Sequence, residues 1–199
     1  MSEHYYTEKP LSKEEIVKIK IHLKNDSFNL FSAKGLFSKD ELDIATKLLI
    51  EKAEIMGKNI LDFGCGYGVV GIALLRDNPE LNVTFSDVNE RAIKITKKNL
   101  DLHKLKGTVV KSNLFENIVE SFDSILSNPP YAAGREICFK LIEDSHKHLN
   151  KGGTLQIVAR HNKGGKVLKE KILDVFGNVE DVAKQSGFRI YMGKKALNK

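Results

Sequence analysis

The stretch Asp62-Phe63-Gly64-Cys65-Gly66-Tyr67-Gly68-Val69-Val70-Gly71 decides the fold predicted from this sequence. It joins an apolar run at 59–63, typical of a strand, to a helix-like run at 69–76. Glycines at such a junction allow a tight turn and let the backbone approach a ligand closely. Because open α/β sheets bind ligands at the carboxyl ends of their strands, the stretch predicts both a fold class and a binding site.

The sequence after this loop alternates short apolar runs with amphipathic segments. Such alternation is typical of an α/β, Rossmann-like domain with a mostly parallel sheet and helices on both faces. The last two strands, joined near Ser186–Gly187, are expected to form an antiparallel hairpin at the end of the sheet. The expected strands are 59–63, 82–86, 108–111, 122–127, 154–159, 179–184 and 188–192, and the expected helices are 69–76, 89–103, 136–149 and 166–176.

The sequence before the loop predicts two further helices and one extended piece. Ser12 and Glu15 form a capping box, and Ile16, Ile19 and Leu23 follow at helical spacing. A short extended piece is expected at 28–31, and a second capping box is formed by Ser38 and Glu41, followed by an apolar helical face of Leu42, Ala45, Leu48 and Leu49. We expect one domain over 1–199, with a helical extension over 1–30 and a catalytic core over 31–199.

Composition limits the kind of protein. The chain has 199 residues, 41% of them hydrophobic, which suits one globular domain. No apolar stretch approaches the roughly 20 residues that a membrane span needs, and the polar N-terminus does not resemble a secretory signal. The two cysteines, Cys65 and Cys138, form no CxxC pair. We therefore expect neither a metal site nor a disulfide framework, and a cytoplasmic location.

Positive charge is concentrated in the C-terminal third. The net charge is +6, but residues 1–133 hold 18 Lys and Arg against 19 Asp and Glu, whereas residues 134–199 hold 14 against 7. A basic third beside a neutral body is compatible with binding along a phosphate backbone. It is equally compatible with an ordinary lysine-rich solvated surface.

The glycine loop fits two classes of cofactor. Gly66-x-Gly68-x-x-Gly71 satisfies the dinucleotide pattern, with Asp87 at the distance of a ribose-binding acid. However, Asp62 lies two residues before the first glycine, where it would repel a pyrophosphate. The methionine end of S-adenosylmethionine carries an ammonium and a sulfonium, which an acid attracts. Asp62 therefore favours S-adenosylmethionine over a nicotinamide or flavin cofactor.

Two polar residues follow the next strands. Asp87 is placed to accept both ribose hydroxyls, although Asp is also a favoured helix N-cap. Asn113 offers a donor and an acceptor that could read an adenine edge, and it could equally be a turn residue.

Ser127-Asn128-Pro129-Pro130-Tyr131 follows the fourth expected strand. The prolines fix an extended backbone, which would aim the Asn128 side chain and a neighbouring carbonyl at one point. Two such acceptors can hold a planar NH₂ group and stabilise it as its nitrogen bonds to a methyl carbon. Tyr131 offers a face on which a flipped base can stack. The motif predicts methylation of an exocyclic amino group.

Over residues 30–195 the sequence resembles the small-domain class I methyltransferases, which include the bacterial ribosomal-RNA guanine-N2 methyltransferases and their stand-alone archaeal relatives. The resemblance rests on Gly35-Leu36-Phe37-Ser38 with Leu42-Asp43, the loop 62–71, Asp87-Val88-Asn89, Asn113-Leu114-Phe115, Asn128-Pro129-Pro130, Gly134-Arg135 and Val175-Phe176-Gly177-Asn178-Val179. It implies a seven-stranded sheet with an antiparallel last strand. It also implies cofactor contacts at Gly64, Gly66, Asp87, Asn113 and Asn128, with Phe37 and Ser38 near the cofactor mouth, unless Phe37 is a hydrophobic staple.

The predicted function is S-adenosylmethionine-dependent N-methylation, most specifically of guanine N2 in ribosomal or transfer RNA. Asn-Pro-Pro-Tyr is equally typical of adenine-N6 methylases and of release-factor glutamine methylases, so both alternatives stay open. The candidate catalytic residues are Asn128, Pro129, Pro130 and Tyr131. The candidate cofactor-binding residues are Phe37, Asp62, Gly64, Cys65, Gly66, Gly68, Asp87, Val88, Asn113, Leu114 and Asn128.

Overall fold

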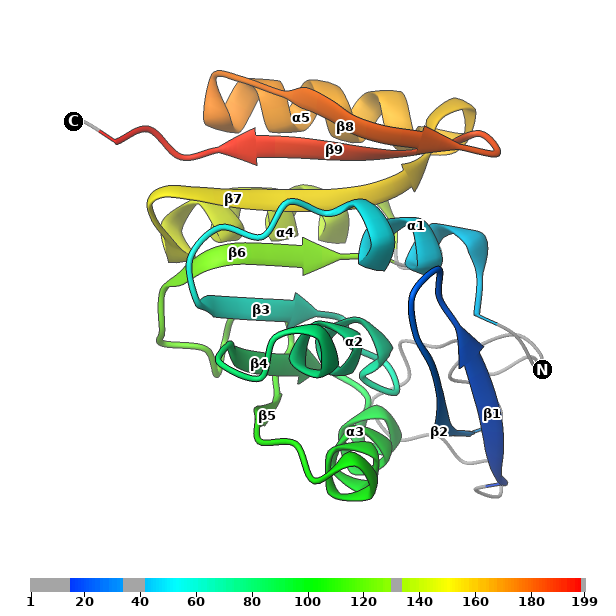
Figure 1. Cartoon of the computed structure of the whole chain (residues 1–199). Coiled ribbons are helices and arrows are strands. Elements are labelled where there is room, and N and C mark those ends of the chain that lie inside the picture. Colours follow the sequence, from blue (N-terminus) through cyan, green and yellow to red (C-terminus); the bar gives the residue numbers. More distant parts are fainter. Residues whose placement is uncertain (1–14, 34–41, 130–133, 198–199) are drawn as a thin grey trace.

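The computed structural model describes residues 15–33, 42–129 and 134–197. At the centre of these residues is a seven-stranded sheet in the order β5-β4-β3-β6-β7-β9-β8 (Figure 1). The first five of these strands pair in parallel, whereas β9 is antiparallel to both of its neighbours. The strands are β3 (Asn59–Phe63), β4 (Asn82–Asp87), β5 (Thr108–Lys111), β6 (Phe122–Ser127), β7 (Leu149–Arg160), β8 (Glu180–Gln185) and β9 (Phe188–Lys194). The predicted sheet, its reversed last strand and the terminal hairpin are confirmed.

Helices cover both faces of this sheet. On one face lie α1 (Ile44–Lys52), α2 (Val69–Asp77) and α3 (Glu90–His103), and on the other lie α4 (Arg135–His148) and α5 (Lys166–Phe176) (Figure 1). The segment η2 (His161–Gly165) precedes α5; the Lys166 amide donates to the His161 carbonyl, while Lys163 and Gly164 have non-helical backbone angles.

Adjacent strand residues serve opposite cores. Ile60 and Leu126 belong to the cluster under α1, α2 and α3, whereas their chain neighbours Leu61 and Ile125 belong to the cluster under α4 and α5. All four side chains are fully buried. Because side chains alternate across a sheet, a strand covered on both faces must be apolar at consecutive positions, as these runs are.

The N-terminal segment forms a hairpin rather than the predicted helix. β1 (Ile16–His22) pairs antiparallel with β2 (Ser27–Ala33), which contains the predicted extended piece. The helix predicted from Ile16, Ile19 and Leu23 was wrong because Ile19, Lys20 and Ile21 also belong to an alternating Ile/Lys run. β-branched residues in such a run favour a strand. Ser12 lies outside the described residues.

α1 is confirmed, with a different start. Asp43 is its N-cap, and its Oδ1 accepts a 2.9 Å hydrogen bond from the Thr46 amide. Leu42 therefore precedes the helix, while Ala45, Leu48 and Leu49 are buried as predicted. The capping box of Ser38 and Glu41 lies outside the described residues. Among the parts of the chain that the structure describes, no helix is long and apolar enough to cross a membrane.

Candidate active site

The glycine loop turns between β3 and α2 through left-handed backbone. Gly64, Gly66 and Gly68 have φ of 69°, 58° and 83°, which a side chain would strain. The amides of Gly64 and Cys65 both donate to the Ser86 carbonyl at 2.9 Å, which ties the turn to the end of β4. A Cβ on Gly71 would lie 2.3 Å from the Phe85 ring, so this glycine lets α2 pack closely against the sheet.

The loop is also held from α3. Thr96 Oγ1 donates to the Gly66 carbonyl at 3.0 Å, and Asn99 Nδ2 donates to the Tyr67 carbonyl at 2.8 Å. Cys65 lies beneath the loop with its Sγ 3.7 Å from Thr96 Oγ1, and burial holds the pKa of its thiol well above the ordinary value. These contacts fix the loop before any ligand binds.

Asp62 is buried beneath the N-terminus of α2. Its Oδ2 accepts a 3.0 Å hydrogen bond from the Gly71 amide. Burial raises the pKa of Asp62 to about 7, with a further rise from the nearby Asp87 charge, against the lowering effect of the Gly71 hydrogen bond. The predicted attraction of this acid for the cationic end of a cofactor stays a prediction, whereas its bond to α2 is structural.

Asp87 ends β4 and connects three segments. Its Oδ2 accepts a hydrogen bond from the Gly66 amide and its Oδ1 accepts one from the Asn89 amide, both at 2.9 Å. The residue is only 4% exposed. Asn89, not Asp87, is the N-cap of α3, because its own Oδ1 accepts from the Arg91 amide. The N-cap alternative for Asp87 therefore does not hold.

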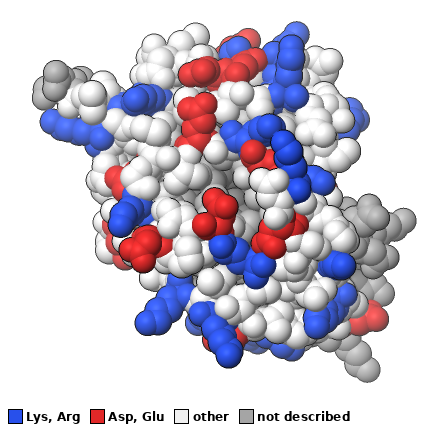
Figure 2. Space-filling view, viewed as in Figure 1, with Lys and Arg blue, Asp and Glu red and all other residues white. Residues whose placement is uncertain are grey.

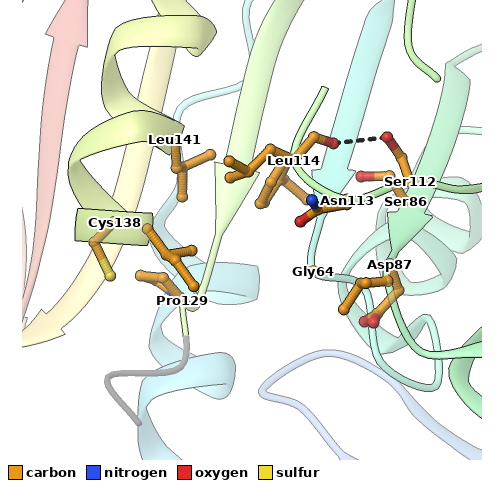
Figure 3. A pocket seen from close by; sticks show the side chains of 12 residues that line it. Gly64, Ser86, Asp87, Ser112, Asn113, Leu114, Pro129, Cys138 and Leu141 are labelled. Carbon is orange, nitrogen blue, oxygen red and sulfur yellow. Dashed lines mark hydrogen bonds between the residues drawn. The ribbon is translucent and has the colours of Figure 1, made fainter. Parts of the chain in front are cut away.

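A pocket opens beside Asp87 at the carboxyl ends of β3, β4, β5 and β6, where the strand order reverses (Figure 3). Figure 3 shows its polar side around Ser86, Asp87 and Ser112, and its apolar side around Leu114, Cys138 and Leu141. Its lining comprises Phe63, Gly64, Ser86, Asp87, Val88, Ser112, Asn113, Leu114, Pro129, Ile137, Cys138 and Leu141.

The pocket collects part of the predicted site. Five predicted cofactor residues line it, together with one predicted catalytic residue: Gly64, Asp87, Val88, Asn113, Leu114 and Pro129. Asp62, Cys65, Gly66, Gly68 and Asn128 are not in its described lining but in the framework around it. The contribution of α4 was not predicted from the sequence. Its signal was the spacing of Ile137, Cys138 and Leu141, which places them on one face of the predicted helix.

One lining group has an unused hydrogen-bonding atom. Ser86 Oγ is buried and has no hydrogen-bond partner among the described residues. Gly64, next to it in the pocket wall, has nothing within 4 Å of the position that a Cβ would take. Since buried polar atoms are normally paired, this polar end of the pocket fits a ligand with hydroxyl or amino groups.

Asn113 lies in a tight turn after β5. Its Nδ2 donates to Glu116 Oε1 at 3.0 Å, and the residue is exposed. Ser112 Oγ donates to the Leu114 carbonyl at 2.8 Å, which holds Leu114 in left-handed backbone with φ of 50°. The turn presents Leu114 to the pocket, while the predicted recognition of an adenine edge by Asn113 stays a prediction.

Asn128 follows β6 and reaches across to α1. Its Nδ2 donates to Thr46 Oγ1 at 2.9 Å. Thr46 is only 3% exposed, and the described residues provide no hydrogen bond to Asn128 Oδ1. The bond therefore orients the amide and leaves its oxygen available as an acceptor. Pro130, Tyr131 and Phe37 lie outside the described residues.

Comparisons with families, curated proteins and solved structures all match methyltransferases. The family model described as methyltransferase small domain matches residues 27–192. The uncharacterized protein YbxB of Bacillus subtilis (strain 168) is 38% identical over 98% of this chain and all of its own length. Ribosomal RNA small subunit methyltransferase C of Photorhabdus laumondii is 40% identical over 81% of this chain and 48% of its own length. The chain thus spans about half the length of relatives with that name.

Two solved structures share the fold. A T. thermophilus 16S rRNA N2 methyltransferase (RsmC), in complex with AdoMet and guanosine, aligns with a TM-score of 0.79 at 20% identity, over 94% of this chain and 52% of its own. A methyltransferase from Pyrococcus furiosus aligns with a TM-score of 0.67 at 22% identity, over 77% of this chain and 82% of its own.

Proposed function

Because the chain belongs to the methyltransferase small domain family, we propose that it methylates an exocyclic amino group, and that this group is N2 of a guanine in RNA. Membership of the family confirms the predicted enzyme class, an S-adenosylmethionine-dependent methyltransferase. The acceptor and the residue roles that follow are proposals. The observation that carries them is the position of Asn128, anchored to α1 beside the Asp87 pocket.

The pocket suits S-adenosylmethionine, which supplies an electrophilic methyl group when bound. Each carboxylate oxygen of Asp87 can accept more than one hydrogen bond, so ribose hydroxyls can bind in addition to the Gly66 and Asn89 amides. Ser86 Oγ offers a further polar contact. Leu114, Ile137 and Leu141 provide an apolar wall for an aromatic ring. The open space beside Gly64 lets a ligand approach its backbone closely.

Asn128 then acts on the acceptor. Its Oδ1 accepts a hydrogen bond from the amino group and holds the nitrogen lone pair toward the methyl donor. As the N–C bond formed and the S–CH₃ bond of the donor broke, the nitrogen would become tetrahedral and positively charged, and its N–H groups would become stronger donors. An acceptor fixed in advance stabilises that state more than the planar ground state. No strong base is required, since the proton becomes acidic only after transfer.

The choice of guanine in RNA rests on the relatives. The relatives called ribosomal RNA small subunit methyltransferase C, about half of whose length this chain spans, are named for ribosomal RNA. The T. thermophilus structure contains guanosine. The free, buried thiols of Cys65 and Cys138 support the proposed cytoplasmic location, where disulfides are rare.

The test is incubation of the protein with methyl-labelled S-adenosylmethionine and total RNA, followed by nucleoside analysis. We expect label in N2-methylguanosine. Label in N6-methyladenosine would show that the acceptor is adenine N6 and not guanine N2. Absence of label from every nucleoside, with label in a release factor supplied in a parallel reaction, would refute an RNA substrate.

A further inference from the structure

The carboxyl end of β7 leads into a basic surface. Residues 160–166 and 184–189 hold five Lys and Arg and no Asp or Glu. We call this surface the basic edge and define it by Arg160, Lys163, Lys166, Lys184 and Arg189. The first four are exposed, and Arg189 is half-buried. The basic edge accounts for part of the positive charge noted in the C-terminal third.

The carboxylate of Asp181 on β8 forms an ion pair with one member of the basic edge, Arg189, and with Lys169 outside it. Asp181 Oδ1 lies 2.7 Å from Lys169 Nζ, and Asp181 Oδ2 lies 2.7 Å from Arg189 Nη1. Its single negative charge is thus shared between two cations. Partial desolvation, and to a smaller extent Arg189 and Lys166, lowers the pKa of His161 against the opposing Asp181 charge.

The basic edge is built on fixed backbone. The His161 amide donates to the Gly187 carbonyl at 2.9 Å, and His161 Nδ1 is 2.7 Å from the Tyr191 hydroxyl in a hydrogen bond. These bonds join η2 to β9 and to the β8–β9 turn. A hollow lies where η2 meets the β8–β9 hairpin, and it is lined by His161, Asn162, Lys184, Gln185, Ser186, Gly187, Phe188 and Arg189.

One aromatic side chain lies within the basic edge. The Arg160 guanidinium lies over the Phe188 ring, 4.9 Å from its centroid. Arg160 and Phe188 are direct partners across β7 and β9. Planar cations and aromatic rings both stack on nucleobases, so the pair suits a nucleotide as well as its phosphate.

The basic edge lies at the same end of the sheet as the pocket. Ser127 pairs with Ile157 in the parallel β6–β7 ladder, so Arg160 lies about two residues beyond the level of Asn128 on the neighbouring strand. At about 3.3 Å per residue this is roughly 7 Å along the strand. Figure 1 shows the β8–β9 turn on the side of the sheet to which the arrowheads of β3, β6 and β7 point.

Charge on the face that Figure 2 presents is mixed. Figure 2 shows Lys and Arg interspersed with Asp and Glu over the face it presents. On this face, attraction of a polyanion therefore depends on local clusters of positive charge.

We propose that the basic edge binds the phosphate backbone of nucleotides that flank the methylated base in an RNA substrate. This inference rests on the proposed function for its substrate class. It adds the surface that holds RNA while Asn128 engages the target, and it assigns Lys163 and Lys184 as phosphate-binding residues. Phosphate contacts of this kind position a nucleic acid without reading its sequence.

The test compares two charge-reversal pairs in the full chain. K163E/K184E alters the basic edge, and K106E/K151E makes the same change at two exposed lysines near the amino ends of β5 and β7, at the opposite end of the sheet. Binding of fluorescein-labelled single-stranded RNA is measured over a range of salt concentrations. Calorimetry with S-adenosylhomocysteine reports whether each variant retains its cofactor pocket.

We expect K163E/K184E to weaken RNA binding about tenfold or more at low salt and to reduce the salt slope by about 0.7 for each phosphate that the protein no longer binds. K163Q/K184Q should give a smaller reduction in affinity, K106E/K151E little change, and all should bind S-adenosylhomocysteine normally. Equal reductions in both reversal pairs, or none in K163E/K184E while the unaltered chain binds RNA, would overturn the inference alone. Failure of the unaltered chain to bind or methylate RNA would instead refute the proposed function.

Discussion

Asn128 Nδ2 donates a 2.9 Å hydrogen bond to Thr46 Oγ1, which joins residues 82 positions apart in the chain. Thr46 is in turn held by the Asp43 cap at the start of α1. An amide side chain can bind in either of two flipped orientations, and in the observed one the NH₂ group of Asn128 faces Thr46. Its oxygen is then the atom available to an amino substrate.

Replacement of Thr46 therefore tests positioning. We expect Thr46→Val to lower kcat about tenfold, which corresponds to loss of one hydrogen bond, with little change in KM for S-adenosylmethionine. Thr46→Ser, which keeps the hydroxyl, should restore most of the rate. Thr154→Val, at another buried threonine on β7, is the matched control. Full turnover by Thr46→Val would mean that Asn128 needs no such anchor.

Replacement of Asp87 should affect cofactor binding. Asp87→Ala removes the acceptor of the Gly66 and Asn89 amides and the proposed ribose acceptor together. We expect affinity for S-adenosylhomocysteine, measured by calorimetry, to fall at least about tenfold, since hydrogen bonds to charged groups contribute about 1.5–3 kcal/mol. Val88→Ala, next to it in the pocket lining, should have a smaller effect. Unchanged affinity in Asp87→Ala would remove Asp87 from the cofactor site.

Asp62 should make the fold less stable as pH rises. Burial raises its pKa in the folded chain to about 7, above the value of 3.8 for an exposed Asp. The stabilisation from its protonated form is complete below about pH 4 and is lost as pH rises toward 7, because the unfolded chain ionises first. Asp62→Asn, which still offers the Gly71 amide an acceptor, should reduce the fall in the free energy of unfolding between about pH 4 and pH 7. Urea unfolding at about pH 4.5 and about pH 8 measures the change in the free energy of unfolding. The same change in the unaltered chain and in Asp62→Asn would contradict the prediction.

His161 reports on the basic edge. The pKa of His161 is lowered by partial desolvation and by Arg189, Lys166 and Lys169, while Asp181 opposes them. A phosphate bound at the basic edge adds negative charge and should raise that pKa. Titration of the His161 ring by NMR, with and without single-stranded RNA, measures the change. A pKa that falls or stays constant while RNA binds would place the RNA elsewhere.

Part of the fold could be predicted because its central strands are buried on both faces and appear as apolar runs, and the predicted bounds of β3 and β6 match those observed. The predicted bounds of β5 and α5 also match, although β5 is a half-buried edge strand and α5 was predicted from its helical spacing. β1 could not be separated from a helix by spacing alone. Its isoleucines fit both periods, and only pairing with β2 decides between them.

The candidate site was predictable where it follows strand ends. Asp87 and Asn113 were identified because parallel strands bring their carboxyl ends together. The anchor of Asn128 was not, because a contact between α1 and the loop after β6 leaves no local pattern in the sequence. Asp62 illustrates the opposite case: its position in the motif was informative, but its bond to the Gly71 amide depends on how α2 packs in three dimensions.

The central claim is methylation of guanine N2 in RNA through Asn128. Its most direct test is mass-spectrometric mapping of modified nucleosides in RNA from a strain that lacks this protein, complemented with the unaltered chain or with Asn128→Ala. We predict that N2-methylguanosine is lost at a specific position, returns with the unaltered chain and does not return with Asn128→Ala, although that variant still binds S-adenosylhomocysteine. An unchanged set of N2-methylguanosines in the deletion strain, or full restoration by Asn128→Ala, would contradict the claim.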